Sequence, residues 1–120
     1  MTKAAALHNF FSSLSLPAYP TTEVPKEPGA KYLTYEPKFG CIDDGDMSIT
    51  VNIWMHTTSE AEPNAAAQRL SEAIGQGGKL LACEGGFIWL KRGAPWCQNL
   101  SDGDWKRRYI NMTAEYLTAD

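Results

Sequence analysis

The sequence predicts an α+β domain in which a mostly antiparallel sheet has helices packed on one face. Two segments show the apolar spacing of helices, and the other regular segments alternate apolar and polar residues as strands do. The order of a helix, two strands, a second helix and then three or four strands is typical of an α+β domain with a mostly antiparallel sheet. The chain has 120 residues, of which 43% are hydrophobic, so we expect a single domain with one self-supporting core.

The N-terminal part is predicted to contain a short helix followed by an extended strap. The helix spans about residues 4–14, where Leu7, Phe10, Phe11 and Leu14 form one apolar stripe. The strap spans about residues 16–30 and is rich in proline, which excludes a helix there. Two interpretations of the strap stay open. It is either a connector that lies on its own domain, which we favour, or an arm that reaches across a neighbouring subunit.

Residues 31–118 are predicted to form the helix-on-sheet core, and its first strands are readily identified. A strand over residues 32–36 is stopped by Pro37, and an acidic turn at residues 43–46 precedes a longer strand. From Met47 to His56, apolar and polar residues alternate strictly, so Ile49, Val51 and Ile53 are expected to be buried. This alternation places Trp54 on the face directed away from the predicted core.

The second helix is predicted to begin near Ser59 and to have Pro63 at its first helical position. Gly75 is expected to end it. Its buried stripe consists of small and branched residues, which allow close packing on a sheet: Ala66, Leu70, Ala73 and Ile74.

The C-terminal part is predicted to form the remaining strands. A hairpin joins residues 79–83 to residues 87–91 around a glycine-rich turn, and a turn at residues 92–95 leads to a short strand near residues 96–99. The last strand covers about residues 106–117. Its alternation places one set of residues on each face of the sheet: Ile110, Met112, Ala114 and Tyr116 on one face, and Tyr109, Asn111, Thr113 and Glu115 on the other.

Composition and charge argue against several classes of protein. With 11 basic and 14 acidic residues the net charge is −3, whereas a dedicated nucleic-acid-binding module needs a basic excess. Cys41, Cys83 and Cys97 are odd in number and widely spaced, so we expect free thiols.

No apolar run approaches the ~20 residues that cross a bilayer. The chain start also lacks the pattern of a secretory signal. We therefore expect an intracellular protein with no membrane partner.

The residues do not form a catalytic, cofactor or metal motif. Gly78-Lys79 follows a helix, whereas a phosphate-binding loop precedes one. The acidic turn lacks the glutamate that completes a calcium loop. No cysteine has a suitably spaced histidine to act as its base. We therefore expect no enzymatic activity, no cofactor and no bound metal.

The candidate functional residues are aromatic and basic, and they are predicted to form an interface. They lie at the end of one long strand and the start of another: Trp54, His56, Lys106, Arg107, Arg108 and Tyr109. Trp, Tyr and Arg are enriched in protein interfaces. Two other interpretations of the basic run stay open, namely a solvated strand end and, less favoured, a surface that stacks on single-stranded nucleic acid.

Several strand and turn patterns together resemble a known family. They are Tyr32 to Glu36, Ile49 to Ser59, Gly85 to Gly93 with Pro95, Lys106 to Asn111, and Glu115 to Thr118. Across residues 32–118 the chain resembles the tail terminator, or tail completion, family of long-tailed phages and prophages. The resemblance implies a subunit of a hexameric ring that caps the tail tube, ends its polymerisation and provides the surface on which the head docks.

The resemblance also implies partners and a location. The partners are other copies of the chain, the tail tube protein and the head–tail connector proteins. The location is the virion, at the tail end or neck, after assembly in the host cytoplasm. Two alternatives stay open: a head-completion or neck connector protein, and a small monomeric binding module that uses the Trp-rich sheet face.

Overall fold

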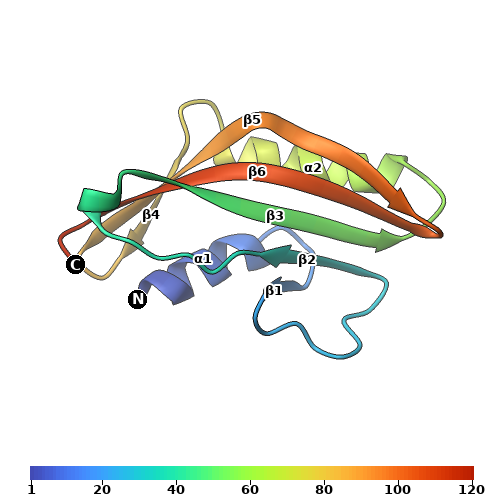
Figure 1. The fold of residues 1–120 in the computed structure, drawn as a ribbon, viewed down its shortest axis with the longest axis horizontal. Coiled ribbons are helices and arrows are strands. Elements are labelled where there is room, and N and C mark those ends of the chain that lie inside the picture. Colours follow the sequence, from blue (N-terminus) through green and yellow to red (C-terminus); the bar gives the residue numbers. More distant parts are fainter.

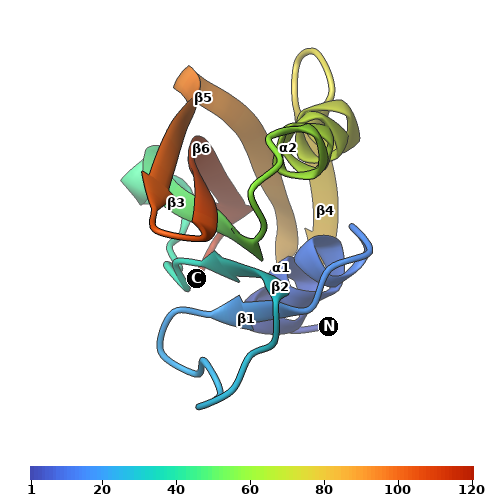
Figure 2. The same ribbon diagram turned by 90° about the vertical axis from the view of Figure 1, so that its right-hand side faces the viewer.

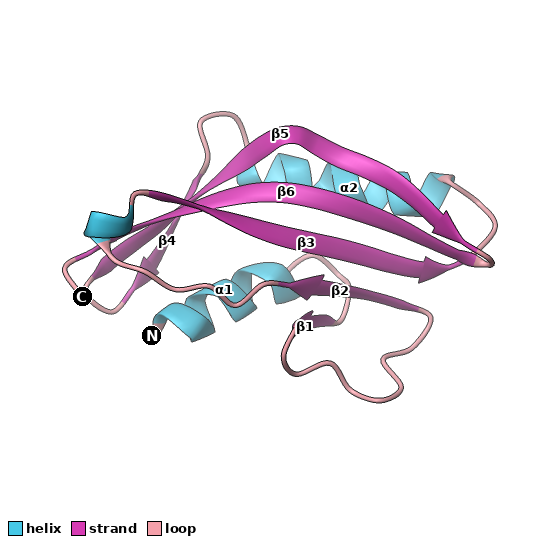
Figure 3. Cartoon of the chain, viewed as in Figure 1, coloured by secondary structure: helices cyan, strands magenta, loops and turns pink.

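The computed structural model describes residues 1–120 and contains two α-helices, one short 3-10 helix and one six-stranded sheet (Figures 1 and 3). In chain order the elements are α1 (Lys3–Ser12), β1 (Ala18–Pro20), β2 (Lys31–Tyr35), η1 (Ile42–Asp44), β3 (Asp46–His56), α2 (Ala61–Ile74), β4 (Lys79–Cys83), β5 (Gly86–Asp102) and β6 (Trp105–Thr118). The predicted α+β class is confirmed. Neither helix is long and apolar enough to span a membrane.

The sheet has the strand order β1-β2-β3-β6-β5-β4. All neighbouring strands pair antiparallel except β1 and β2, which are parallel. The prediction of a mostly antiparallel sheet is therefore confirmed. The sheet curls strongly (Figure 2), and α1 contacts both β1 at one edge and β4 at the other. The second helix, α2, contacts the central strands β3, β5 and β6.

One hydrophobic cluster of 22 buried residues forms the core. The predicted alternation of β3 is confirmed, because Ile49, Val51 and Ile53 are almost completely buried. They belong to the same cluster as Leu70 and Ile74 of α2. Since successive side chains of a strand point to opposite faces, this register turns the intervening residues of β3 away from the core.

Helix α2 begins at Ala61, so Pro63 is its third residue rather than its first. The predicted position of Pro63 was therefore wrong. The Ser59 hydroxyl accepts a hydrogen bond from the Ala61 N–H (3.1 Å), which starts the helix before the proline. The predicted end is confirmed. Gly75 has a φ of +75°, and its N–H donates to the Ser71 carbonyl (3.0 Å).

The prediction of a turn and a separate short strand near residue 96 was wrong. Strand β5 runs from Gly86 to Asp102, and its pairing with β6 is only interrupted between Arg92 and Cys97. The backbone passes so close to β6 there that a Cβ on Gly93 would lie 2.7 Å from the Asn111 carbonyl oxygen. The Asn111 side chain also donates to the Pro95 carbonyl (2.9 Å), which holds the bulge against the sheet.

The proline-rich strap divides into two parts. In the first part, Leu16 and Ala18 are buried and β1 pairs with β2, so this part packs on its own domain as expected for a connector. The second part, residues 21–30, is exposed along nearly its whole length. We call it the arm. Figure 2 shows the arm extending from β1 and β2 on the side away from β3, β5 and β6.

Candidate protein-binding interface

The candidate interface lies on the face of the sheet that points away from the core, which we call the outward face. Strands β3 and β6 pair in a register that sets Trp54 opposite Arg107 and Asn52 opposite Tyr109. On the next strand, Tyr32 is opposite Trp54. Directly opposed residues of neighbouring strands have side chains on the same face and in contact range. The sheet therefore gathers these five side chains into one group.

The side chains of this group stack on one another. The rings of Tyr32 and Trp54 are 6.1 Å apart and nearly parallel, with an interplanar angle of 14°. The Arg107 Cζ atom lies 4.9 Å from the Trp54 ring centroid and 5.6 Å from that of Tyr109. Asn52 holds the guanidinium in place, because its Oδ1 accepts a hydrogen bond from Arg107 Nε (2.8 Å). The arrangement is a pre-organised cation–aromatic platform.

A cleft of about 470 Å³ opens at the end of this platform. Its lining consists of aromatic, aliphatic and polar side chains: Tyr32, Trp54, Leu100, Ser101, Asp102, Trp105 and Arg107. Trp105 meets Tyr32 edge to face at 6.2 Å. The exposed His56 ring lies 5.3 Å from the Trp105 ring, and its Nε2 is 3.9 Å from Asp104 Oδ2. A cleft with aromatic walls and one cation suits an extended peptide segment.

Arg108 is not available to a partner, which corrects the prediction that it is an interface residue. It points into the protein and its exposed fraction is 0%. Its Nη2 atom contacts Glu60 (3.0 Å) and Asn64 (2.9 Å), and its Nε also donates to Asn64 (3.2 Å). Arg108 therefore anchors the start of α2 to β6.

Lys106 is only half-exposed, and it lies at the end of the sheet. Its Nζ donates to the Ser101 hydroxyl (2.9 Å) across the β5–β6 turn. The alternation of residues along β6 is the sequence signal that assigns Lys106 and Arg108 to one face of the strand and Arg107 to the other. The inward residues of β6 include Ile110 and Met112, so the same period of two assigns positions 108 and 106 to the inward series.

The far end of the outward face is electrically different from the Arg107 end. Lys91 contacts Asp46 (2.7 Å) and Glu115 (3.3 Å), and its Nζ lies 4.1 Å from the Trp89 ring centroid. The hydrogen bond to Asp46 is the main cause that raises the pKa of Lys91. Burial lowers this pKa, and the contact with Glu115 raises it further. Arg107, in contrast, has no carboxylate partner in the chain.

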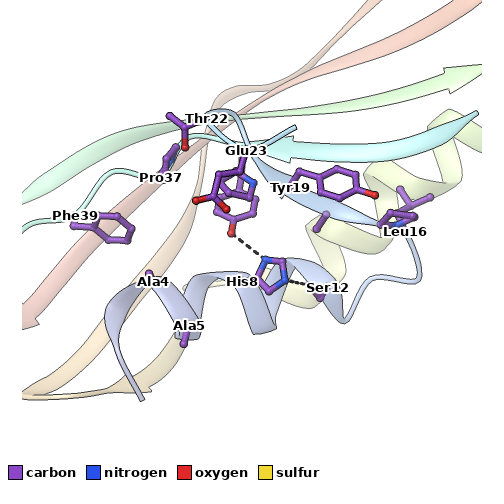
Figure 4. Close-up of a pocket in the computed structure, with 14 residues that line it drawn as sticks. Ala4, Ala5, His8, Ser12, Leu16, Tyr19, Thr22, Glu23, Pro37 and Phe39 are labelled. Carbon is purple, nitrogen blue, oxygen red and sulfur yellow. Dashed lines mark hydrogen bonds between the residues drawn. The ribbon is translucent and has the colours of Figure 1, made fainter. Parts of the chain in front are cut away.

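A second concavity, of about 830 Å³, lies between α1 and the strands β1 and β2. Figure 4 shows His8 at its centre with Ser12 beside it on the same helix. His8 Nδ1 is 3.2 Å from the Tyr35 hydroxyl, and His8 Nε2 is 3.2 Å from the Ser12 hydroxyl. Burial raises the pKa of Tyr35, and the nearby Glu23 carboxylate adds to this. This pocket was not predicted from the sequence, although the i, i+4 spacing of His8 and Ser12 places both on one helix face.

The structure contains no cluster of three or more His, Cys, Asp or Glu side chains that could hold a metal ion. Cys41, Cys83 and Cys97 are free and half-buried. Burial raises the pKa of the Cys97 thiol, while the charge of Arg108 lowers it.

No protein-family model, curated protein or solved structure matches the chain.

Proposed function

We propose that this protein is a subunit of a hexameric ring that caps the tail tube of a long-tailed phage or prophage, ends the polymerisation of the tube and provides the surface on which the head docks. The observation that carries the proposal is the stacked group of Trp54, Arg107 and Tyr109 on the outward face. Such side chains are typical binding hot spots. The resemblance of residues 32–118 to tail terminators supplies the kind of assembly.

The chemistry of the outward face supports a protein partner rather than a reaction. Trp54 is half-buried by Tyr32 and Arg107, so part of its desolvation has already occurred in the free subunit. A partner that covers the remainder meets rigid side chains and loses little side-chain entropy on binding. In this proposal both helices lie on the opposite side of the sheet, which leaves the outward face to the partner.

A capping ring also places a requirement on geometry. The contact between subunits has to be head-to-tail and to close after a fixed number of copies, because a contact that does not close gives a filament. The proposed partners are further copies of this chain, the tail tube protein and the head–tail connector proteins. The proposed location is the virion, at the tail end, after assembly in the host cytoplasm. No catalytic residue or cofactor takes part.

The proposal is tested by electron microscopy of tails made by a lysogen with and without this chain. Tubes of uniform length with a ring at one end support capping, whereas overlong tubes are expected without the chain. A neck connector would leave tube length unchanged and fail only in joining heads. A monomeric binding module would affect neither tube length nor head joining.

A further inference from the structure

The arm has the properties of a segment that binds elsewhere. Thr21 to Glu27 are all exposed, and the aliphatic residue Val24 is 39% exposed. Pro25 and Pro28 hold φ near −65°, which favours an extended polyproline-like backbone. Lys26 and Glu27 form no ion pair within the chain. Glu23 forms none either, so the arm carries an apolar pair, Val24 and Pro25, with one free charge before it and two free charges after it.

The cleft beside Trp54 has complementary features. Tyr32, Trp54 and Trp105 form aromatic walls, and aromatic-lined grooves bind proline-rich segments in several families of recognition domain. Arg107 supplies a cation without a carboxylate partner, and the exposed Asp102 on the rim supplies an anion without a cationic partner. An occupant that brings an aliphatic–proline pair followed by one positive and one negative charge would satisfy all of these groups.

We propose that the arm of one copy of this chain binds in the Trp54 cleft of the next copy. Val24 and Pro25 pack against the aromatic walls, Lys26 pairs with Asp102, and Glu27 pairs with Arg107. The inference deepens the proposed ring and rests on it, because it names the segment and the cleft that form the contact between subunits.

The positions of the arm and of the Trp54 cleft are compatible with a contact between two copies of the chain. In its own chain the arm ends at Ala30, whose carbonyl accepts a hydrogen bond from the His56 N–H of β3 (2.8 Å), but the middle of the arm points away from β3, β5 and β6, which carry most of the cleft (Figure 2). The arm is a loop of ten residues that leaves β1 and returns to β2, so its middle can extend from the domain by the length of half of these residues. At ~3.3 Å per residue, this reach is about 15 Å. Arm and cleft are different surfaces of one chain, so each copy donates an arm to one neighbour and accepts an arm from the other. This head-to-tail arrangement is the kind that closes into a ring.

The inference is tested by cross-linking two differently tagged forms of the full chain, one carrying Val24→Cys and the other Ser101→Cys at the cleft. The matched control replaces the first form by Gln68→Cys, which lies exposed on α2 outside both the arm and the cleft. The native cysteines are the same in every sample. A short bismaleimide should join the Val24→Cys and Ser101→Cys copies with a yield several-fold above the control.

Charge reversal separates the specific contact from chance collisions. Glu27→Arg in the arm copy should reduce the yield to the control level, and Arg107→Glu in the cleft copy should then restore it. A yield equal to the control, or one that Glu27→Arg leaves unchanged, overturns the arm contact. If tubes are still capped in that case, the proposed function stands without it; cross-linking without capping would instead overturn the proposed function.

Discussion

The guanidinium of Arg107 lies over the indole of Trp54, with the Arg107 Cζ atom 4.9 Å from the ring centroid, although the two residues belong to different strands. The register of β3 with β6 creates this contact. Arg108 follows Arg107 on β6 and has the same guanidinium group. Unlike Arg107, it is completely buried and contacts α2 through Asn64. Function and stability are therefore expected to divide between two adjacent arginines.

The first prediction separates binding from folding at Trp54. Trp54→Ala should weaken the contact between subunits by at least ~2 kcal/mol, about thirtyfold in affinity, because interface tryptophans are frequent hot spots. Its melting temperature should fall by only a few degrees, since the ring lies on the outward face. Trp89→Ala is the matched control: it removes an indole from the same face, beside the neutralised Lys91, and should leave assembly unchanged. Equal assembly by both variants, measured by sedimentation, would refute the assignment.

The second prediction concerns the adjacent arginines. Arg108→Ala should lower the free energy of unfolding by roughly 2–3 kcal/mol, because it removes charge-assisted hydrogen bonds to Glu60 and Asn64. Arg107→Ala should cost less than about 1 kcal/mol, the usual value of an exposed cation–π contact. Urea denaturation of the two variants measures the difference. Equal destabilisation would contradict the separate positions of the two side chains.

The third prediction tests the register of β3 with two neighbouring aspartates. Val51→Asp places a carboxylate in the core, at a cost of several kcal/mol that is comparable with the whole stability of a small domain. It should therefore unfold the protein. Asn52→Asp puts the same group on the outward face beside Arg107 and should leave the fold intact. Circular dichroism distinguishes them, and a folded, cooperative Val51→Asp variant would show that the register is wrong.

The fourth prediction concerns alkaline pH. Burial raises the pKa of Tyr116, and its hydroxyl donates to the Lys38 carbonyl (2.5 Å). Above pH ~10 the unfolded chain releases this proton while the folded protein retains it, so stability is full below that pH and falls as the pH rises. Tyr116→Phe should lose about 1 kcal/mol at neutral pH and show a shallower decline between pH 10 and 12. Parallel slopes of the urea midpoint against pH would contradict this.

Strands β3 and β4 were the parts of the fold that local sequence predicted best. Alternation identified the buried residues of β3, and the bounds of β4 were predicted as the structure has them. The continuity of β5 was missed because Gly93, Ala94 and Pro95 have the local sequence of a turn. The strand continues there because β6 lies within reach, and Asn111 holds the bulge. That contact depends on tertiary structure.

In the candidate site, too, some positions follow from the sequence of a single strand, whereas others depend on tertiary structure. Trp54 was correctly predicted to lie on the outward face, because its position depends only on the period of its own strand. Its neighbours Tyr32 and Arg107 depend on how three strands align, which no single segment specifies. Arg108 was misplaced because a run of basic residues was interpreted as exposed, although the period of β6 assigns it to the core.

The most direct test measures the length of tail tubes in the electron microscope. Tails are prepared from a lysogen that carries the parent chain, Trp54→Ala, Trp89→Ala or no copy of the gene. A capping ring predicts tubes of one length with the parent and with Trp89→Ala, and overlong tubes of variable length with Trp54→Ala and without the gene. Tubes of the same length in all four preparations would contradict the proposal that this protein ends the growth of the tail.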